Sequence, residues 1–255
     1  NKLVLLDIDA AGIATLTLNR PDDANSLVES VKLELFQALT EIENNRHVRA
    51  VILRGNGARF SGGGDIYEMR DHLDDAPRFI GLAIDRFHNV IMALRRLKVP
   101  VIAAVQGAAA GGSFSLAMAC DVVVAAEDAR FVVAYPKLAA APDGGLSFFV
   151  TRRLGAKGAI DVLLLRDALG AREALDIGLI TRVVPFDQLA QTARDIAQRI
   201  VSLPAQSVRE IKALIGSLHD TELAQQLAAE RAAFVRCAGE ADFRERVLAF
   251  FDKKC

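Results

Sequence analysis

The sequence of 255 residues has no tryptophan, only two tyrosines and almost no net charge, because 31 Lys and Arg side chains face 32 Asp and Glu side chains. A nucleic-acid-binding protein needs a basic surplus or stripe to offset the phosphates, and many such proteins stack aromatic rings on bases. Both features are missing. We therefore expect no nucleic-acid partner.

Long hydrophobic runs are missing as well. The most apolar segment, residues 99–126, is interrupted by Pro100, Gln106, several glycines and Asp121, whereas a membrane-spanning helix needs about 20 apolar residues in a row. The first residues become acidic too soon for a signal peptide. Three cysteines lie far apart with no CxxC pair, which favours reduced thiols. We expect a soluble cytoplasmic protein that does not enter a membrane.

What the sequence does have is an alternation of strand and helix patterns over about the first 188 residues. Hydrophobic side chains make up 52 % of the chain, enough for a sizeable core. Strands are predicted at residues 3–6 and 13–18 (a hairpin turning at Gly12), 50–53, 101–105 and 122–125, and helices after a capping Ser26 and over residues 79–97. Such alternation is typical of a layered α/β core.

From Leu189 onward only amphipathic helical patterns remain, in four successive stretches. We therefore divide the chain into an α/β core of residues 1–200 and a helical region of residues 201–255.

Two glycine-rich segments each follow a predicted buried strand and lead toward a helix. The first, residues 58–69, contains Gly62-Gly63-Gly64; the second, residues 105–116, contains Gly111-Gly112. Glycine lets a backbone N–H approach a ligand closely, and two such donors aimed at one oxygen would form an oxyanion hole. Neither segment fits a phosphate-binding fingerprint. Each segment, taken alone, is equally compatible with an ordinary turn between strand and helix.

Taken together, the motifs resemble one family. Phe60-Ser61-Gly62-Gly63-Gly64-Asp65-Ile66-x-Glu68-Met69 and Gln106-Gly107-x-Ala109-x-Gly111-Gly112 resemble the crotonase (enoyl-CoA hydratase/isomerase) superfamily. Further matching segments follow in the same order along the chain: residues 18–26, Cys120-Asp121, Pro142-Asp143-Gly144-Gly145 and residues 171–185. The resemblance implies a spiral of ββα units, C-terminal helices that assemble a homotrimer or a dimer of trimers, and an acyl-CoA thioester substrate. Coenzyme A is then part of the substrate, and no separate cofactor is expected.

The resemblance also implies roles for individual residues. The oxyanion donors would be the backbone N–H groups of Gly64 and Gly112. Phe250 would pack near the CoA moiety from a neighbouring subunit. Contacts to the substrate are expected from Ala24, Phe60, Ser61, Gly62, Asp65, Ile66, Tyr135 and Phe250. Asp65 is also well placed to cap a helix, and for Glu68 we expect a solvated position.

Acid and base groups distinguish the branches of this family. Typical hydratases carry two glutamates, at positions that correspond here to Ser115 and Tyr135. Adding water to a double bond requires one group that activates water and another that protonates carbon, and neither side chain suits that work. The remaining candidate is Asp143, whose counterpart in isomerase-like branches shuttles a proton. Burial in an apolar pocket would raise its pKa and improve it as both base and acid. A plain Pro-Asp-Gly-Gly turn is the alternative.

We therefore predict an acyl-CoA isomerase that shifts a double bond through an enolate, with Asp143 as catalytic proton shuttle. Two alternatives stay open: an enoyl-CoA hydratase with atypical acid and base groups, and a non-catalytic oligomer that keeps the fold. The four histidines lack carboxylate or thiol partners at ligand spacing, so no metal site is predicted.

Overall fold

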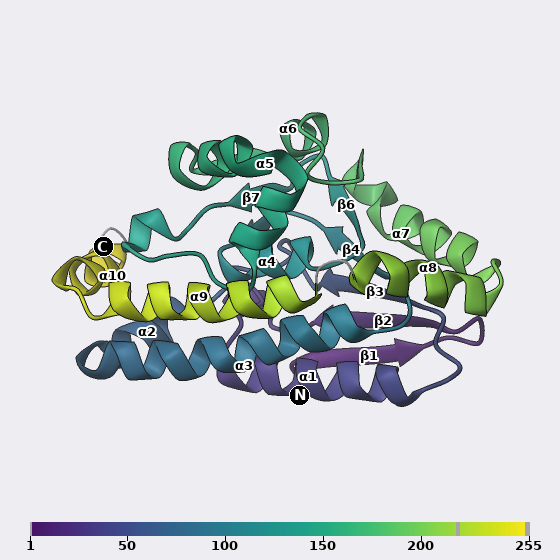
Figure 1. Ribbon diagram of the computed structural model, residues 1–255, viewed down its shortest axis with the longest axis horizontal. Helices are drawn as coiled ribbons and strands as arrows, with labels where there is room; N and C mark the ends of the chain where they lie inside the picture. Colours follow the sequence, from purple (N-terminus) through teal and green to yellow (C-terminus); the bar gives the residue numbers. More distant parts are fainter. Residues whose placement is uncertain (1, 218–219, 253–255) are drawn as a thin grey trace.

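The computed structural model describes residues 2–217 and 220–252 of the chain. Its main sheet has six strands in the order β1-β2-β3-β4-β6-β9 (Figure 1). These are β1 (Val4–Ile8), β2 (Ile13–Leu18), β3 (Ala50–Gly55), β4 (Val101–Val105), β6 (Val122–Ala126) and β9 (Arg182–Val184). β1 and β2 form the predicted antiparallel hairpin, and every later pair in this sheet is parallel. The predicted α/β core is confirmed.

A second sheet was not predicted. It contains β5 (Ala108–Ala110), β7 (Arg130–Val132) and β8 (Ala168–Gly170), in the order β5-β7-β8. Each of these strands is three residues long, too short to show an alternating pattern of polar and apolar residues. This small sheet positions the second glycine-rich segment, because β5 lies between β4 and the helix that follows.

Helices account for 58 % of the chain. No helix within the described part of the chain is long and apolar enough to span a membrane. The α-helices are α1 (Glu29–Asn44), α2 (Ile66–Asp71), α3 (Ala76–Arg96), α4 (Gly112–Met118), α5 (Leu146–Leu165), α6 (Ala171–Asp176), α7 (Phe186–Val201), α8 (Ala205–Ser217), α9 (Asp220–Ala238) and α10 (Ala241–Asp252), with short 3₁₀ helices at Pro21–Asp23, Leu73–Asp75 and Pro136–Leu138. α1 begins at Glu29 after Val28, not with a Ser26 cap, because the Ser26 hydroxyl donates to Asp65 instead.

The central strands β3, β4 and β6 are buried on both faces over most of their length, which explains why they are largely apolar rather than alternating. The edge strand β1, in contrast, has exposed positions. In β3, Val51 and Leu53 point into the large core that α1 and α3 share. Ile52 points the other way, into a smaller core with Leu189 and Ala193 of α7. A strand enclosed by helices on both sides must be hydrophobic at every position.

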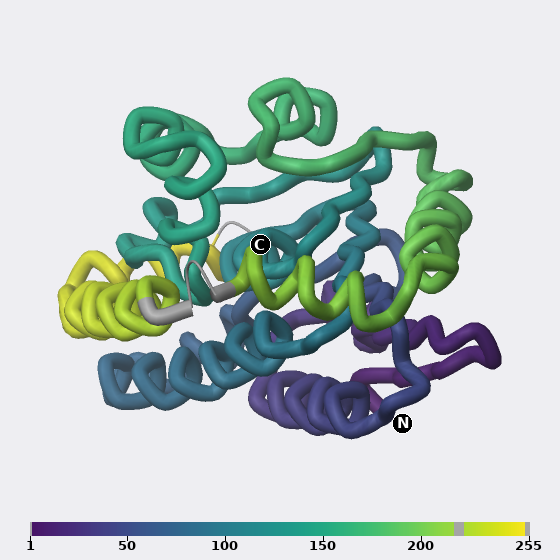
Figure 2. The backbone as a smooth tube through the Cα atoms, turned by 45° about the vertical axis from the view of Figure 1, so that its right-hand side comes forward, coloured from purple at the N-terminus to yellow at the C-terminus, as the bar shows by residue number. Residues whose placement is uncertain are grey.

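The four predicted C-terminal helices are present as α7 to α10. Figures 1 and 2 show α9 running alongside α3, in keeping with their extensive contact. The expected boundary near residue 200 coincides with the end of α7, and the division into two regions stays a prediction. α9 nevertheless packs directly onto the core, so it can contribute side chains to a site there.

Apolar side chains remain exposed on several helices. They include Ile160 and Leu165 on α5 and Ile211 and Ile215 on α8. Exposed apolar patches of this kind are typical of protein interfaces. The expected trimer or dimer of trimers stays a prediction.

Candidate active site

The two glycine-rich segments lie against each other. Ser61 and Ala109 form a parallel bridge in which the Ser61 N–H donates to the Ala108 carbonyl at 3.0 Å. The tightest point is Gly63, where φ is +82° and a Cβ would lie 2.2 Å from the Ala110 carbonyl oxygen. Only glycine tolerates both the left-handed backbone and this close approach. The predicted juxtaposition of the two segments is therefore real.

Gly64 and Gly112 each leave a backbone N–H available. Among the hydrogen bonds of the described residues, neither N–H is a donor, and both glycines line one cavity. A Cβ on Gly63, the residue before Gly64, would lie 3.3 Å from the Gly112 nitrogen, so the two donors are close together. Two neighbouring free N–H groups facing one cavity form an arrangement that can stabilise a negatively charged oxygen.

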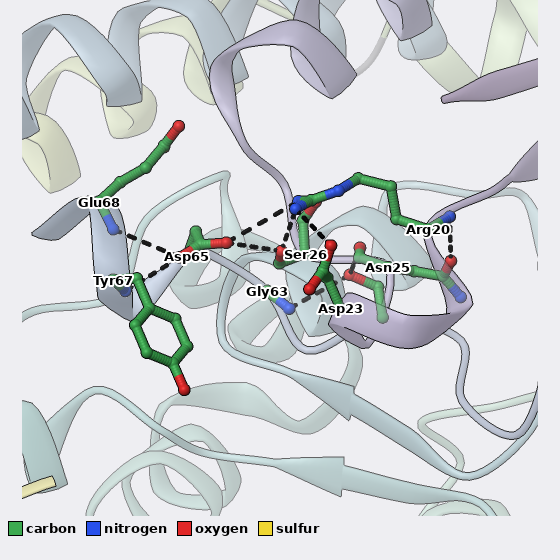
Figure 3. Close-up of polar contacts among 9 residues, drawn as sticks. Arg20, Asp23, Asn25, Ser26, Gly63, Asp65, Tyr67 and Glu68 are labelled. Carbon is green, nitrogen blue, oxygen red and sulfur yellow. Dashed lines mark hydrogen bonds and ion pairs between the residues drawn. The ribbon is translucent and has the colours of Figure 1, made fainter. Parts of the chain in front are cut away.

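Asp65 fixes the first segment by capping α2 (Figure 3). Its Oδ1 accepts hydrogen bonds from the N–H groups of Tyr67 and Glu68 at 2.9 and 3.3 Å, while Oδ2 accepts from the Ser26 hydroxyl at 2.8 Å. Arg20 donates to the same Ser26 hydroxyl at 2.8 Å. These contacts give Asp65 the expected capping role.

The cavity between these segments and α3 has a volume of about 370 Å³. Most of its lining is apolar and comes from the segment before α1, the first glycine segment, α3 and the C-terminal helices. Representative apolar lining residues are Leu27, Ile66, Met69, Phe79, Ile80, Ile84, Phe87, Phe234 and Phe250. Such a space suits a hydrocarbon-rich ligand with few polar groups.

Asp143 is the buried carboxylate of this cavity, with only 9 % of its surface exposed. The Tyr135 hydroxyl donates to Asp143 Oδ1 at 2.6 Å, and the Ser115 hydroxyl donates to the Asp143 carbonyl at 2.7 Å. A Cβ on Gly112 would lie 3.7 Å from Asp143 Oδ1. The carboxylate therefore lies beside one of the two free N–H groups.

Burial raises the pKa of Asp143 to about 6, although the Tyr135 hydrogen bond and the charge of Lys32 act to lower it. Burial also raises the pKa of Tyr135 well above its usual value, so the phenol stays protonated and remains a donor. A carboxyl group with a pKa near 6 can both take and return a proton near neutral pH.

The backbone after Asp143 is held by two buried side chains from different helices. The Gly144 N–H donates to His88 Nε2 of α3 at 3.3 Å, while Glu230 of α9 accepts from the N–H groups of Gly145 and Ser147 at 2.6 and 2.9 Å. Burial lowers the pKa of His88 to about 4, so its imidazole is neutral and can accept. Burial raises the pKa of Glu230 to about 7.

Sequence reasoning missed Glu230, His88 and Lys32, because none belongs to a motif. A signal was present in the helical spacing. Glu230 continues the apolar stripe of Leu223 and Leu227, and His88 follows Ile84 at a spacing of four. A polar residue on the buried stripe of an amphipathic helix indicates a buried polar contact.

The structure separates the expected substrate-contacting residues into two groups. Those that line the cavity are Gly62, Gly64, Asp65, Ile66, Gly112, Tyr135, Asp143 and Phe250. Ala24, Phe60 and Ser61 lie outside its lining, and both Phe60 and Ser61 are completely buried. Substrate contact by these residues stays a prediction.

Two positions differ from expectation. Phe250 lines the cavity of its own chain, whereas the resemblance places this aromatic against a neighbouring subunit's site. Glu68, expected to be solvated, is half-buried and lines the same cavity, because α2 turns this side of the helix inward.

Comparison with known proteins places this architecture in context. A family model described as enoyl-CoA hydratase/isomerase matches residues 9–255. The chain is 37 % identical to a 1,2-epoxyphenylacetyl-CoA isomerase of Escherichia coli strain K12, over 95 % of this chain and 93 % of that protein. It is 35 % identical to a short-chain-enoyl-CoA hydratase of Clostridium acetobutylicum, over 95 % and 92 % of the two chains. The crystal structure of an enoyl-CoA hydratase from Mycobacterium avium subsp. paratuberculosis K-10 superposes with a TM-score of 0.87 at 32 % identity, covering 97 % of this chain and 98 % of that one.

Proposed function

This chain belongs to the enoyl-CoA hydratase/isomerase (crotonase) family, and we propose that it is an isomerase that shifts the double bond of a 3-enoyl-CoA thioester to position 2. Relatives carry both isomerase and hydratase names, so the choice depends on this chain's own residues. The single observation that carries it is the state of Asp143, a buried carboxyl group that two hydroxyl groups hold beside a free oxyanion donor.

The proposed reaction begins with the thioester oxygen between the N–H groups of Gly64 and Gly112. Asp143, as carboxylate, removes a proton from C2 of the 3-enoyl group. The electrons released form a dienolate whose negative oxygen the two N–H donors stabilise. Asp143 then returns the proton to C4, which leaves the double bond between C2 and C3. One carboxyl group suffices, because the same proton is taken and given back.

The site suits this sequence of steps electrostatically. Asp143 must be ionised to begin and protonated to finish, and burial sets its pKa to about 6. A general acid–base group works best when its pKa lies near the working pH. Tyr135 donates to Oδ1 and so leaves Oδ2 for the substrate.

The test is the Asp143→Asn variant, assayed on trans-3-hexenoyl-CoA by following formation of the 2-enoyl product. We expect kcat to fall by about 10²- to 10⁴-fold, the usual contribution of a general acid–base group. Asp195→Asn, on an exposed position of α7, is the matched control and should retain full activity. Near-normal turnover by Asp143→Asn would disprove the proposed role.

A hydratase is the second candidate, and one observation favours it. Glu68 lines the same cavity as Asp143, so a second carboxyl group is present there besides Asp65, which caps α2. Offering trans-2-hexenoyl-CoA and trans-3-hexenoyl-CoA in parallel separates the two activities. Hydration of the 2-enoyl substrate with negligible isomerisation would replace our proposal with the hydratase. Failure to bind any acyl-CoA in calorimetry would instead favour a non-catalytic oligomer.

A further inference from the structure

Lys32 of α1 places a cationic side chain in the mostly apolar cavity. Only 6 % of its surface is exposed, and it lines the cavity together with Leu27, Ile80 and Ile84. Its ammonium group donates to the Ala83 carbonyl at 3.3 Å, and Ala83 lines the cavity as well. Within residues 2–217 and 220–252 this is its one hydrogen bond.

A hydrocarbon acyl chain would leave this amine poorly satisfied. An ammonium group has three N–H donors, and the Ala83 carbonyl uses one of them. An apolar group that filled the cavity would displace water from the other two N–H donors and would offer them no hydrogen-bond acceptor. Leaving buried donors without partners is costly, most of all for a charged group. The cavity is therefore incomplete without an acceptor from the ligand.

We propose that Lys32 binds an oxygen on the acyl group, so that the substrates of this site are acyl-CoA thioesters carrying an uncharged keto, hydroxyl or ether oxygen. This inference rests on the proposed function in one respect, namely that the cavity takes the acyl part of an acyl-CoA. It adds the chemical class of that acyl group, which the sequence motifs do not assign.

The charges around Lys32 favour an uncharged oxygen over a carboxylate. The carboxyl groups of Glu29, Glu68 and Asp143 all act on its charge. Glu29 already pairs with Arg86 at 2.6 Å, which leaves Lys32 facing the other two. A carboxylate at the end of the acyl group would add a third negative charge to this enclosed space, where screening is weak. A neutral oxygen accepts the hydrogen bond without that repulsion.

The protonation state of Lys32 does not alter the recognition. Burial lowers the pKa of Lys32, while its neighbouring carboxylates raise it. Both the ammonium and the neutral amine carry N–H donors, so either form can bind an oxygen.

A different role for Lys32 would be to hold down the pKa of Asp143, since its charge acts in that direction. The two roles make different predictions. An effect through Asp143 would change the pH profile of every substrate alike and would leave the binding of unreactive acyl groups unchanged. Recognition of an oxygen would change binding only for acyl groups that carry one at the right place.

The experiment measures binding by calorimetry to the full chain, using octanoyl-CoA and four analogues with a single keto group at C4, C5, C6 or C7. These saturated thioesters do not isomerise, so the result is independent of the proposed reaction. For the wild-type protein we expect at least one keto analogue to bind about tenfold more tightly than octanoyl-CoA, as expected for one hydrogen bond to a charged donor. The CoA monothioester of octanedioic acid is expected to bind more weakly than that analogue.

Lys32→Met tests the residue directly, because methionine is unbranched, neutral and apolar. We expect this variant to lose the preference for the keto analogue while binding octanoyl-CoA at least as well as the wild type, which also shows that the site is folded. Lys157→Met, at an exposed position of α5, should keep the preference.

Three results would overturn the proposal: no preference for any keto analogue in the wild type, a preference that survives in Lys32→Met, or tightest binding by the octanedioic acid thioester. The measurements on the wild-type protein can refute the proposal even if Lys32→Met binds none of the thioesters. Loss of the keto preference leaves the isomerase proposal intact, whereas an active Asp143→Asn variant disproves the isomerase proposal and leaves this binding result valid.

Discussion

Removing the hydroxyl group of Tyr135 should change the pH at which Asp143 works. This hydroxyl donates to Asp143 Oδ1 at 2.6 Å in a buried setting, and it is the leading influence that holds the pKa of Asp143 down against burial. Tyr135→Phe keeps the ring and its packing against Phe234. The change is confined to the hydroxyl group, which also forms a longer hydrogen bond of 3.2 Å with the Ser115 hydroxyl.

The magnitude follows from the strength of that bond. A hydrogen bond to a charged group contributes about 1.5–3 kcal/mol net, and one pKa unit corresponds to about 1.4 kcal/mol. The carboxylate form alone receives the full bond, so its loss should raise the pKa of Asp143 by about one to two units. Starting from about 6, the variant should titrate between about 7 and 8.

The assay is kcat/KM for isomerisation of trans-3-hexenoyl-CoA between pH 5 and 9. In the wild type, activity should fall as the pH drops below about 6, because the protonated acid cannot remove the C2 proton. In Tyr135→Phe this fall should begin one to two pH units higher, with activity recovering in alkaline buffer. Tyr67→Phe changes the other of the chain's two tyrosines and should leave the profile in place. An acid limb of Tyr135→Phe that stays near pH 6 would refute the reasoning.

Three further predictions follow from the same contacts. Gly63→Ala should destabilise the protein by about 1–3 kcal/mol more than Gly178→Ala in chemical denaturation. Both glycines have a positive φ, but only at Gly63 would a Cβ lie against a carbonyl oxygen. Equal losses of stability in the two variants would contradict this. Because burial raises the pKa of Asp143 from 3.8 to about 6, its stabilising contribution is complete below pH 4 and is lost as the pH rises through 6. The free energy of unfolding of Asp143→Asn relative to wild type should therefore increase by up to about 3 kcal/mol between pH 4 and 7. A difference that does not change with pH would exclude the raised pKa of Asp143. Glu230→Gln should lower kcat at least about tenfold with little change in KM, because its amide cannot accept from both Gly145 and Ser147; an unchanged kcat would show that the loop holds without Glu230.

Much of the fold could be predicted from the sequence, because long elements with clear periodicity report their own burial. The hairpin of β1 and β2, the apolar strands β3, β4 and β6, and the C-terminal helices all carry such patterns. The second sheet could not be predicted, since three residues such as Ala108–Ala110 do not establish a period. Ser26 was misassigned as a helix cap because its real partner, Asp65, lies 39 residues away.

The candidate site also has some features that the sequence predicts and others that only the structure shows. The glycine-rich segments that carry Gly64 and Gly112 are visible in the sequence, because the preceding residues Gly63 and Gly111 have positive φ, which favours glycine. For side chains that reach the site from distant helices, the helical spacing indicates at most a buried position and does not identify the contact. Lys32 and Glu230 are recognised as part of the site only when α1 and α9 are placed against the cavity and the loop.

The resemblance to the family predicts that Ser115 and Tyr135 correspond to the positions where hydratases carry glutamates, and in this structure the two residues make other contacts. Both are buried, and each hydroxyl donates to Asp143, one to its carbonyl and one to its carboxylate. A glutamate at either position would replace a donor with a second negative charge, which would raise the pKa of Asp143 further and weaken it as a base at neutral pH. In the proposed isomerase mechanism, the two hydroxyl groups therefore leave Asp143 as the one carboxyl group that takes and returns the proton.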